Sequence, residues 1–280
     1  MLKRNYYYLV AGFPDIVLDQ KKIPFSLTEL KQELKYHLHS DDYQLVEYLF
    51  LQYDNINFLN LLLKKEAEFN PLGNYSQSFF TDEIKEPEKL PEYMKKFLIS
   101  YREENPVRPN LSLENQLTWF YYDFMLGQKN EFLNQWFNFL RDVNNIFTIY
   151  NARKFELNVE NQIIGDYELT ESAKRTASKD FGLANEFPYI EQIIGIYENT
   201  DIVEQEMAID LLKWNYIDVL NTFNSFSVEQ VLAFVIKFMM MERWTKLETE
   251  PGNEIFKKML YDLENSIQFS KDFNIHEKRR

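Results

Sequence analysis

The sequence predicts an all-α fold with, at most, one small β element. Apolar residues recur at spacings of three and four along most of the chain, which is the period of an amphipathic helix. Strand-like alternation covers only Phe155, Leu157 and Val159, and the apolar run Tyr6–Val10 has no period that classifies it. Glycine, the residue that tight turns most often need, accounts for only 7 of the 280 residues.

Three helical stripes lie between residues 40 and 150. Ser40 or Asp41 is the predicted N-cap of the first, Gly127 terminates the second, and Asn130 is the predicted cap of the third. Each stripe defines one apolar helix face that should be buried. The apolar positions are Leu45, Leu49, Tyr53, Ile56, Leu59 and Leu63; then Leu113, Leu117, Phe120 and Phe124; then Phe132, Trp136, Phe139, Val143, Ile146 and Tyr150.

More helices are predicted in the C-terminal half. Pro188 suits the first turn of a helix, and Asp201 and Ser227 each begin a sequence that resembles a capping box. The helix that starts near Val228 must end before Pro251. A last helix, over residues 255–267, leads into a basic tail at 276–280.

Five of the nine prolines lie between residues 70 and 110, which predicts a linker there. Proline removes a backbone donor and restricts the residue before it, so only a short helix around Glu92–Tyr101 is expected in this stretch. The chain is therefore divided into a first helical lobe (1–70), a proline-rich linker (71–110), a second lobe (111–200) and a third lobe with the basic tail (201–280).

A weak internal repeat supports this division. Asp54-Asn55-Ile56 and Asn144-Asn145-Ile146 each lie in the second half of an aromatic-rich helix, and each is followed by a basic residue, Lys64 or Arg153. The offset is 90 residues. A third unit, from Trp214 to Leu247, has a similar size but lacks the asparagine pair, and each unit would bury its apolar face against a neighbour.

Composition excludes some function classes. The 31 Lys and Arg against 44 Asp and Glu give a net charge of −13, which disfavours nucleic acid as a partner. With no cysteine, disulfides and thiolate metal sites are excluded. The most apolar stretch, Val231–Met241, is shorter than the roughly 20 residues that span a bilayer, so we expect no membrane span. No targeting signal is recognisable, which favours a cytoplasmic location.

The motifs of common catalytic and cofactor sites are also missing. Neither phosphate-binding glycine pattern occurs, and His37 and His39 are spaced so that they point away from each other on a helix. Asp41-Asp42 is better explained by helix capping than by a metal motif. We therefore predict no catalytic residue, no cofactor and no metal.

One candidate partner-binding patch follows a Phe-Met-Met-Met run. Glu242, Arg243 and Trp244 combine an aromatic anchor with an arginine, residue types that are favoured at interface centres. The alternative is a core helix that emerges into solvent, with its charged residues paired locally.

The opening Asn5-Tyr6-Tyr7-Tyr8-Leu9-Val10-Ala11-Gly12-Phe13-Pro14-Asp15 resembles the start of a divergent bacterial family associated with V/A-type ATPase operons. The body resembles the C-type coupling protein of those rotary enzymes, whose eukaryotic version is called d. The matching segments are 54–59, 144–146 running on to Arg153, and the apolar run 234–241 that leads into Glu242 and Arg243.

The resemblance implies three helical lobes arranged as a funnel, without bond chemistry. Such a protein couples the central shaft to the membrane rotor ring for ion transport, and it is peripheral to the membrane through these partners. Two alternatives stay open. One is an all-α interaction scaffold unrelated to rotary ATPases, and the other is an all-α enzyme that uses buried carboxylates.

Overall fold

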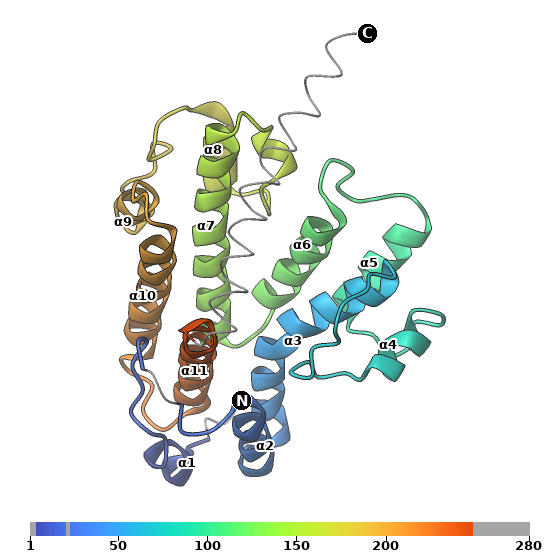
Figure 1. Cartoon of the computed structure of the whole chain (residues 1–280), viewed down its shortest axis with the longest axis vertical. Helices are drawn as coiled ribbons and strands as arrows, with labels where there is room; N and C mark the ends of the chain where they lie inside the picture. Colours follow the sequence, from blue (N-terminus) through green and yellow to red (C-terminus); the bar gives the residue numbers. More distant parts are fainter. Residues whose placement is uncertain (1–3, 21–22, 249–280) are drawn as a thin grey trace.

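The computed structural model describes residues 4–20 and 23–248, and it confirms the all-α prediction (Figure 1). Those residues form eleven α-helices and one short 3-10 helix, with no strand among them. The elements are α1 (Tyr7–Ala11), α2 (Leu27–His37), α3 (Ser40–Leu62), α4 (Gln77–Glu83), α5 (Glu92–Arg102), α6 (Leu113–Leu126), α7 (Glu131–Lys154), η1 (Val159–Asn161), α8 (Glu168–Arg175), α9 (Ile190–Tyr197), α10 (Ile202–Asn221) and α11 (Val228–Glu248).

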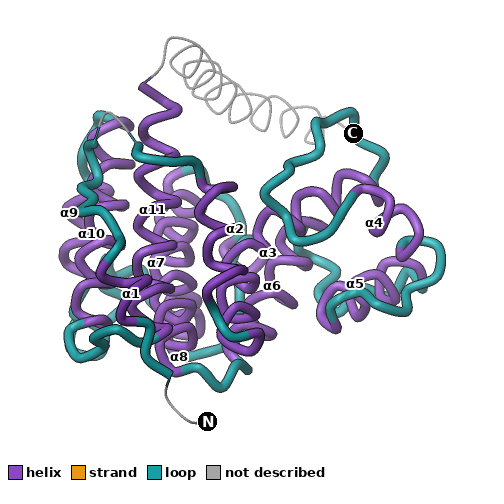
Figure 2. The backbone as a smooth tube through the Cα atoms, turned by 90° about the horizontal axis from the view of Figure 1, so that it is seen from below, coloured by secondary structure: helices purple, strands orange, loops and turns teal. Residues whose placement is uncertain are grey.

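Helix α7 is central to the packing. It contacts α6 on one side and α9 and α10 on the other, while α11 packs on α10 and also reaches α2 and α3 (Figure 1). Figure 2 places α4 and α5 at one end of the molecule and α9 and α10 at the opposite end. The buried apolar residues form one cluster that extends from Leu18 to Trp244. Helix α11 thus joins the end of the described chain to its beginning.

Helix α7 matches its predicted pattern, and α6 ends before Gly127 as predicted, but only Leu117 of the four apolar positions predicted for α6 is buried and the other three are half-buried. Asn130 caps α7 by accepting the Leu133 N–H at 3.0 Å, and Gly127 follows the last residue of α6. All six apolar positions predicted for α7 are buried. The start of α10 at Asp201 and the short helix in the proline-rich stretch, α5, are also confirmed.

Helix α3 corrects two predictions. Its N-cap is His39, whose ring accepts the Asp41 N–H, rather than Ser40 or Asp41. Ile56 of the predicted stripe is 53% exposed, whereas the polar residues Asp54 and Asn57 are buried. The physical reason is that α3 contacts four helices, α2, α4, α6 and α11, so a single apolar stripe does not describe its buried surface.

Two other local predictions change, and one segment that the sequence left unclassified is assigned to a helix. The segment expected as a β element is a turn and a short loop between α7 and η1: Phe155 is the C-cap of α7, Glu156 adopts a left-handed conformation, and Val159 starts η1. Tyr6–Val10 is mostly α1. Pro188 precedes α9 instead of lying in its first turn, because the Ile190 N–H closes a turn onto the Phe187 carbonyl.

Residues 71–110 contain α4 and α5, whose side chains Phe80, Met94, Phe97 and Leu98 belong to the common core. The division into a linker and three lobes stays a prediction. The helix expected over 255–267 and the basic tail lie outside the described residues.

The internal repeat has a structural counterpart, in a register two residues from the predicted one. The Asn57 side chain donates to the Asn70 carbonyl at 2.9 Å and accepts the Asn70 N–H at 2.8 Å. Asn145 makes the same pair of bonds to the Ile164 carbonyl and N–H, at 2.6 and 2.8 Å. The offset is therefore 88 residues, and it aligns Asp54-x-x-Asn57 with Asp142-x-x-Asn145.

Asn145→Ala should lower the free energy of unfolding by about 3 kcal/mol, because it leaves a buried N–H and a buried C=O without partners. The matched control is Asn144→Ala, which loses one bond to the Tyr122 hydroxyl from an exposed position and should cost about 1 kcal/mol or less. Urea unfolding curves measure both. Equal costs would contradict the anchoring role of Asn145.

Candidate functional site

A groove of about 670 Å³ opens between α3, α6, α7, α10 and α11. Helices from both halves of the chain build it. Its walls carry aromatic and long aliphatic side chains together with polar and charged groups. The lining residues are Leu49, Gln52, Tyr53, Asn55, Ile56, Asn70, Leu72, Thr118, Tyr121, Tyr122, Trp136, Phe137, Leu140, Asn144, Asp210, Lys213, Ile236, Met239, Met240, Glu242, Arg243 and Lys246.

The asparagines Asn55 and Asn144 of the sequence repeat both line this groove. Asn55 accepts the Tyr93 hydroxyl at 2.6 Å, and Asn144 donates to the Tyr122 hydroxyl at 2.9 Å. Each amide is therefore held by a tyrosine and keeps further hydrogen-bonding capacity. The groove can therefore present the side-chain amides of Asn55 and Asn144 to a partner, and the tyrosine hydroxyls hold these amides in place.

Charged residues gather where α10 meets α11. The buried Asp210 carboxylate accepts the Trp244 indole N–H at 2.9 Å and the Arg243 guanidinium, and the Lys213 Nζ lies 3.6 Å away. Arg243 also lies 3.5 Å from a carboxylate oxygen of Glu206. Burial of an ion pair requires such multiple partners, so this cluster fixes α11 against α10.

The three residues predicted to bind a partner have different surroundings. Glu242 is buried and accepts the N–H of Leu27, the first residue of α2, at 3.2 Å, while Lys246 pairs with its other oxygen at 2.8 Å. Trp244 is only 5% exposed. Arg243 is exposed and lines the groove together with Glu242. A partner-binding role for the three residues stays a prediction, and within the chain they join α11 to α2 and α10.

One groove wall rests on a loop that Asp54 holds. The buried carboxylate accepts the N–H of Asn74 at 2.8 Å and that of Tyr75 at 3.2 Å. The Lys31 ammonium donates to the carbonyls of Leu72 and Gly73, at 2.8 and 3.0 Å. Loop residues Asn70 and Leu72 line the groove, so this network positions part of the site.

The pKa of the Asp54 side chain is set mainly by its burial. Burial raises the pKa of Asp54 to about 6, although the N–H groups of Asn74 and Tyr75 and the Lys31 ammonium oppose that rise. Burial also lowers the pKa of Lys31. The loop is thus held by two groups, the Asp54 carboxylate and the Lys31 ammonium, whose charged forms are disfavoured by burial.

Sequence reasoning missed Lys31, Asp54 and the loop at 70–75 as parts of this site. Asp54 was recognised only as a repeat position, and its loop partners lie about 20 residues further on. The available signal was Pro71-Leu72-Gly73-Asn74, because proline and glycine next to asparagine are typical of an ordered turn.

The histidines and the aspartate pair have local partners. His37 pairs with Glu33 at 3.2 Å, and His39 caps α3. Asp42 accepts the Tyr6 hydroxyl and the Arg4 guanidinium, so it holds the N-terminal segment. Within the described parts of the chain, no group of three His, Cys, Asp or Glu side chains is placed to hold a metal ion.

Gly73→Ala should lower the free energy of unfolding by about 2 kcal/mol, because a Cβ there would lie 2.5 Å from the Asp54 Oδ1 and would overpack the loop. Gly195→Ala is the matched control. This glycine lies inside α9 with open space around it, so alanine should add about 0.5–1 kcal/mol. Thermal melts that shift in the same direction for both variants would contradict the proposed close approach.

Asp54 should also make stability depend on pH. Because its folded-state pKa is about 6 and its ordinary value is 3.8, the folded protein binds this proton more tightly than the unfolded chain does. Its contribution to the free energy of unfolding should therefore fall between about pH 4 and pH 6, on the order of 2 kcal/mol, and then level off. The measurement is urea unfolding of wild type and Asp54→Asn from pH 4 to 7. A stability difference that does not change with pH would rule this out.

Comparison with known proteins identifies one family. A family model described as "Protein of unknown function (DUF2764)" matches residues 3–267. No curated protein and no solved structure matches the chain. No helix in the described parts of the chain has the length and hydrophobicity of a bilayer-crossing segment.

Proposed function

The chain belongs to the DUF2764 family, and from its groove we propose that it is a non-catalytic coupling subunit of a V/A-type ATPase. In this role it would link the central shaft to the membrane rotor ring and would work at the membrane periphery through these partners. The observation that carries the proposal is the groove between α3, α6, α7, α10 and α11.

The groove has the character of a helix-binding site. Aliphatic and aromatic side chains such as Ile56, Leu140 and Trp136 line it, and so do the cationic side chains of Lys213 and Arg243. Amphipathic helices bind apolar grooves of this kind through residues on one face, with charges fixing the orientation. The helical end of a shaft subunit is therefore a suitable occupant.

A coupling subunit must also resist deformation. Side-chain bonds from Asn57, Asn145 and Asp54 tie the loops to the long helices, and Asp210 ties α11 to α10. Packed interiors have low compressibility and transmit strain. Torque applied at the groove would therefore pass through the body with little internal movement.

Ile56→Glu tests the groove directly. Ile56 is 53% exposed on a groove wall, so a charge there should leave folding intact while weakening shaft binding at least tenfold. The matched control is Val219→Glu, at a position on α10 that is 66% exposed and does not line the groove. Purified protein is mixed with shaft subunits and membrane rotor, and the complex is quantified by size-exclusion chromatography.

Removal of the chain tests the role. Without it, ion transport should be lost while the soluble heads still hydrolyse ATP. Full coupling in its absence would reject the proposal. Binding of another partner at the groove, in a genome without neighbouring ATPase genes, would instead favour an interaction scaffold unrelated to rotary enzymes.

A further inference from the structure

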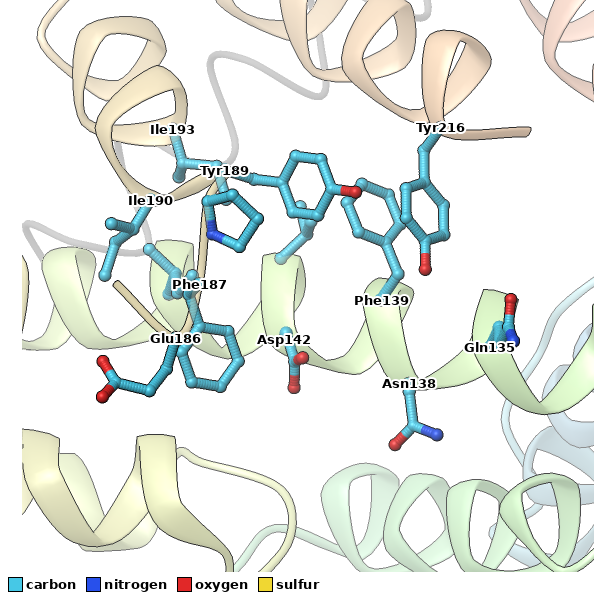
Figure 3. Close-up of a pocket in the computed structure, with 13 residues that line it drawn as sticks. Gln135, Asn138, Phe139, Asp142, Glu186, Phe187, Tyr189, Ile190, Ile193 and Tyr216 are labelled. Carbon is cyan, nitrogen blue, oxygen red and sulfur yellow. The ribbon is translucent and has the colours of Figure 1, made fainter. Parts of the chain in front are cut away.

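A second, smaller pocket lies on another face of α7, where the loop before α9 and the helix α10 close over it (Figure 3). Its volume is about 230 Å³. It shares no lining residue with the groove, so the two sites are separate.

One wall of this pocket is aromatic. The rings of Phe139 and Tyr216 stack at 3.8 Å between centroids, and Tyr189 meets both edge-on at 5.1 and 5.4 Å. Figure 3 shows these three rings gathered on one side of the pocket. Aromatic faces attract cations through their quadrupole, most strongly where water is excluded.

The pocket contains two kinds of polar side chain besides its tyrosines: carboxylates, which attract positive charge, and neutral amides. Asp142 and Glu186 supply carboxylates, while Gln135 and Asn138 supply amides. Gln135, Asn138 and Asp142 follow one another along α7 in Figure 3. No Lys or Arg side chain from the described residues lines the pocket, so its charge has one sign.

The internal repeat gives independent evidence about Asp142. Its counterpart Asp54 has backbone hydrogen-bond donors, because its carboxylate accepts the loop N–H groups of Asn74 and Tyr75. In the second unit the asparagine, Asn145, still anchors its loop, but no loop N–H reaches Asp142. Its Oδ1 is buried and has no hydrogen-bond partner among the described residues.

Two groups near Asp142, Arg141 and Tyr167, replace such a donor only in part. The Arg141 guanidinium stacks on the Tyr167 ring at 3.7 Å, and its Nε stays 3.8 Å from Oδ1, beyond hydrogen-bonding distance. Burial raises the pKa of Asp142, and the Tyr167 hydroxyl and the Arg141 charge only partly oppose this. Asp142 thus has the Tyr167 hydroxyl and the Arg141 charge beside it, while its Oδ1 keeps the capacity to accept a hydrogen bond.

We propose that this pocket binds an organic cation, an alkylammonium group that packs on Tyr189 and Tyr216 and is neutralised by Asp142 with Glu186 at the rim. The group could belong to a small amine or to a lysine side chain of a partner protein, since both present the same chemistry. The inference rests on the pocket and does not depend on the coupling role.

The first experiment compares a cation with its neutral isostere. Full-length protein is titrated with choline and, separately, with 3,3-dimethylbutan-1-ol, which has the same shape without the charge, and binding is followed by NMR. Choline should bind at least tenfold more tightly than the alcohol. Equal affinity for the two compounds would show only apolar filling and would overturn the proposal.

Variants locate the site. Asp142→Asn keeps the shape of the side chain and should weaken cation binding at least tenfold, and Glu186→Gln, at an exposed rim position, should weaken it about threefold. Glu191→Gln is the matched control, because Glu191 is an exposed carboxylate in the first turn of α9 that does not line the pocket. Circular dichroism melts confirm that each variant is folded, and Glu186→Gln keeps the test decisive if Asp142→Asn does not fold.

A second arm distinguishes the two sources of the cation. A peptide with one lysine among alanines is compared with the same peptide carrying glutamine instead. Asp142-dependent binding of choline points to a small amine, and Asp142-dependent binding of the lysine peptide alone points to a partner protein. Failure of both cations to bind, or binding that survives in both folded pocket variants, would overturn the proposal.

Discussion

The fold depends on one type of interaction, the pairing of a buried asparagine side chain with the backbone of a returning loop. After α3 and after α7 the chain folds back along the helix that it has just left, and the loop backbone is thereby removed from water. Buried N–H and C=O groups without partners are costly. An asparagine amide supplies a donor and an acceptor at once, so a single side chain from Asn57 or Asn145 satisfies both groups.

This constraint also determines where the groove lies. Asn145 points to its loop, and its neighbour Asn144 consequently faces the groove from the next position along the helix. In α3 the same division holds between Asn57 and Asn55. The anchors thus fix the rotation of both long helices about their axes, which in turn fixes the residues that the groove presents.

The sequence predicted those parts of the fold that depend on local physics. The stripe of α7, its cap Asn130 and the cap Asp201 are set by neighbours within four residues, and they were correct. The anchors could not be predicted in this way, because Asn145 and Ile164 are 19 residues apart and nothing local marks them as partners. Likewise, the contact of Glu242 with the start of α2 spans 215 residues, so no local sequence pattern could indicate it.

Helix α10, the third long helix, also buries a polar side chain, but that side chain binds other side chains instead of a loop backbone. Between α10 and α11 the chain turns within six residues, so no loop returns along α10 and an asparagine would have no backbone to satisfy. Its buried polar residue is Asp210, which binds the Arg243 and Trp244 side chains of the following helix. A carboxylate suits this position because its partners are donors only, whereas an amide would face them with its own NH₂ group. The absence of an asparagine anchor on α10 therefore reflects what its buried side chain must hold.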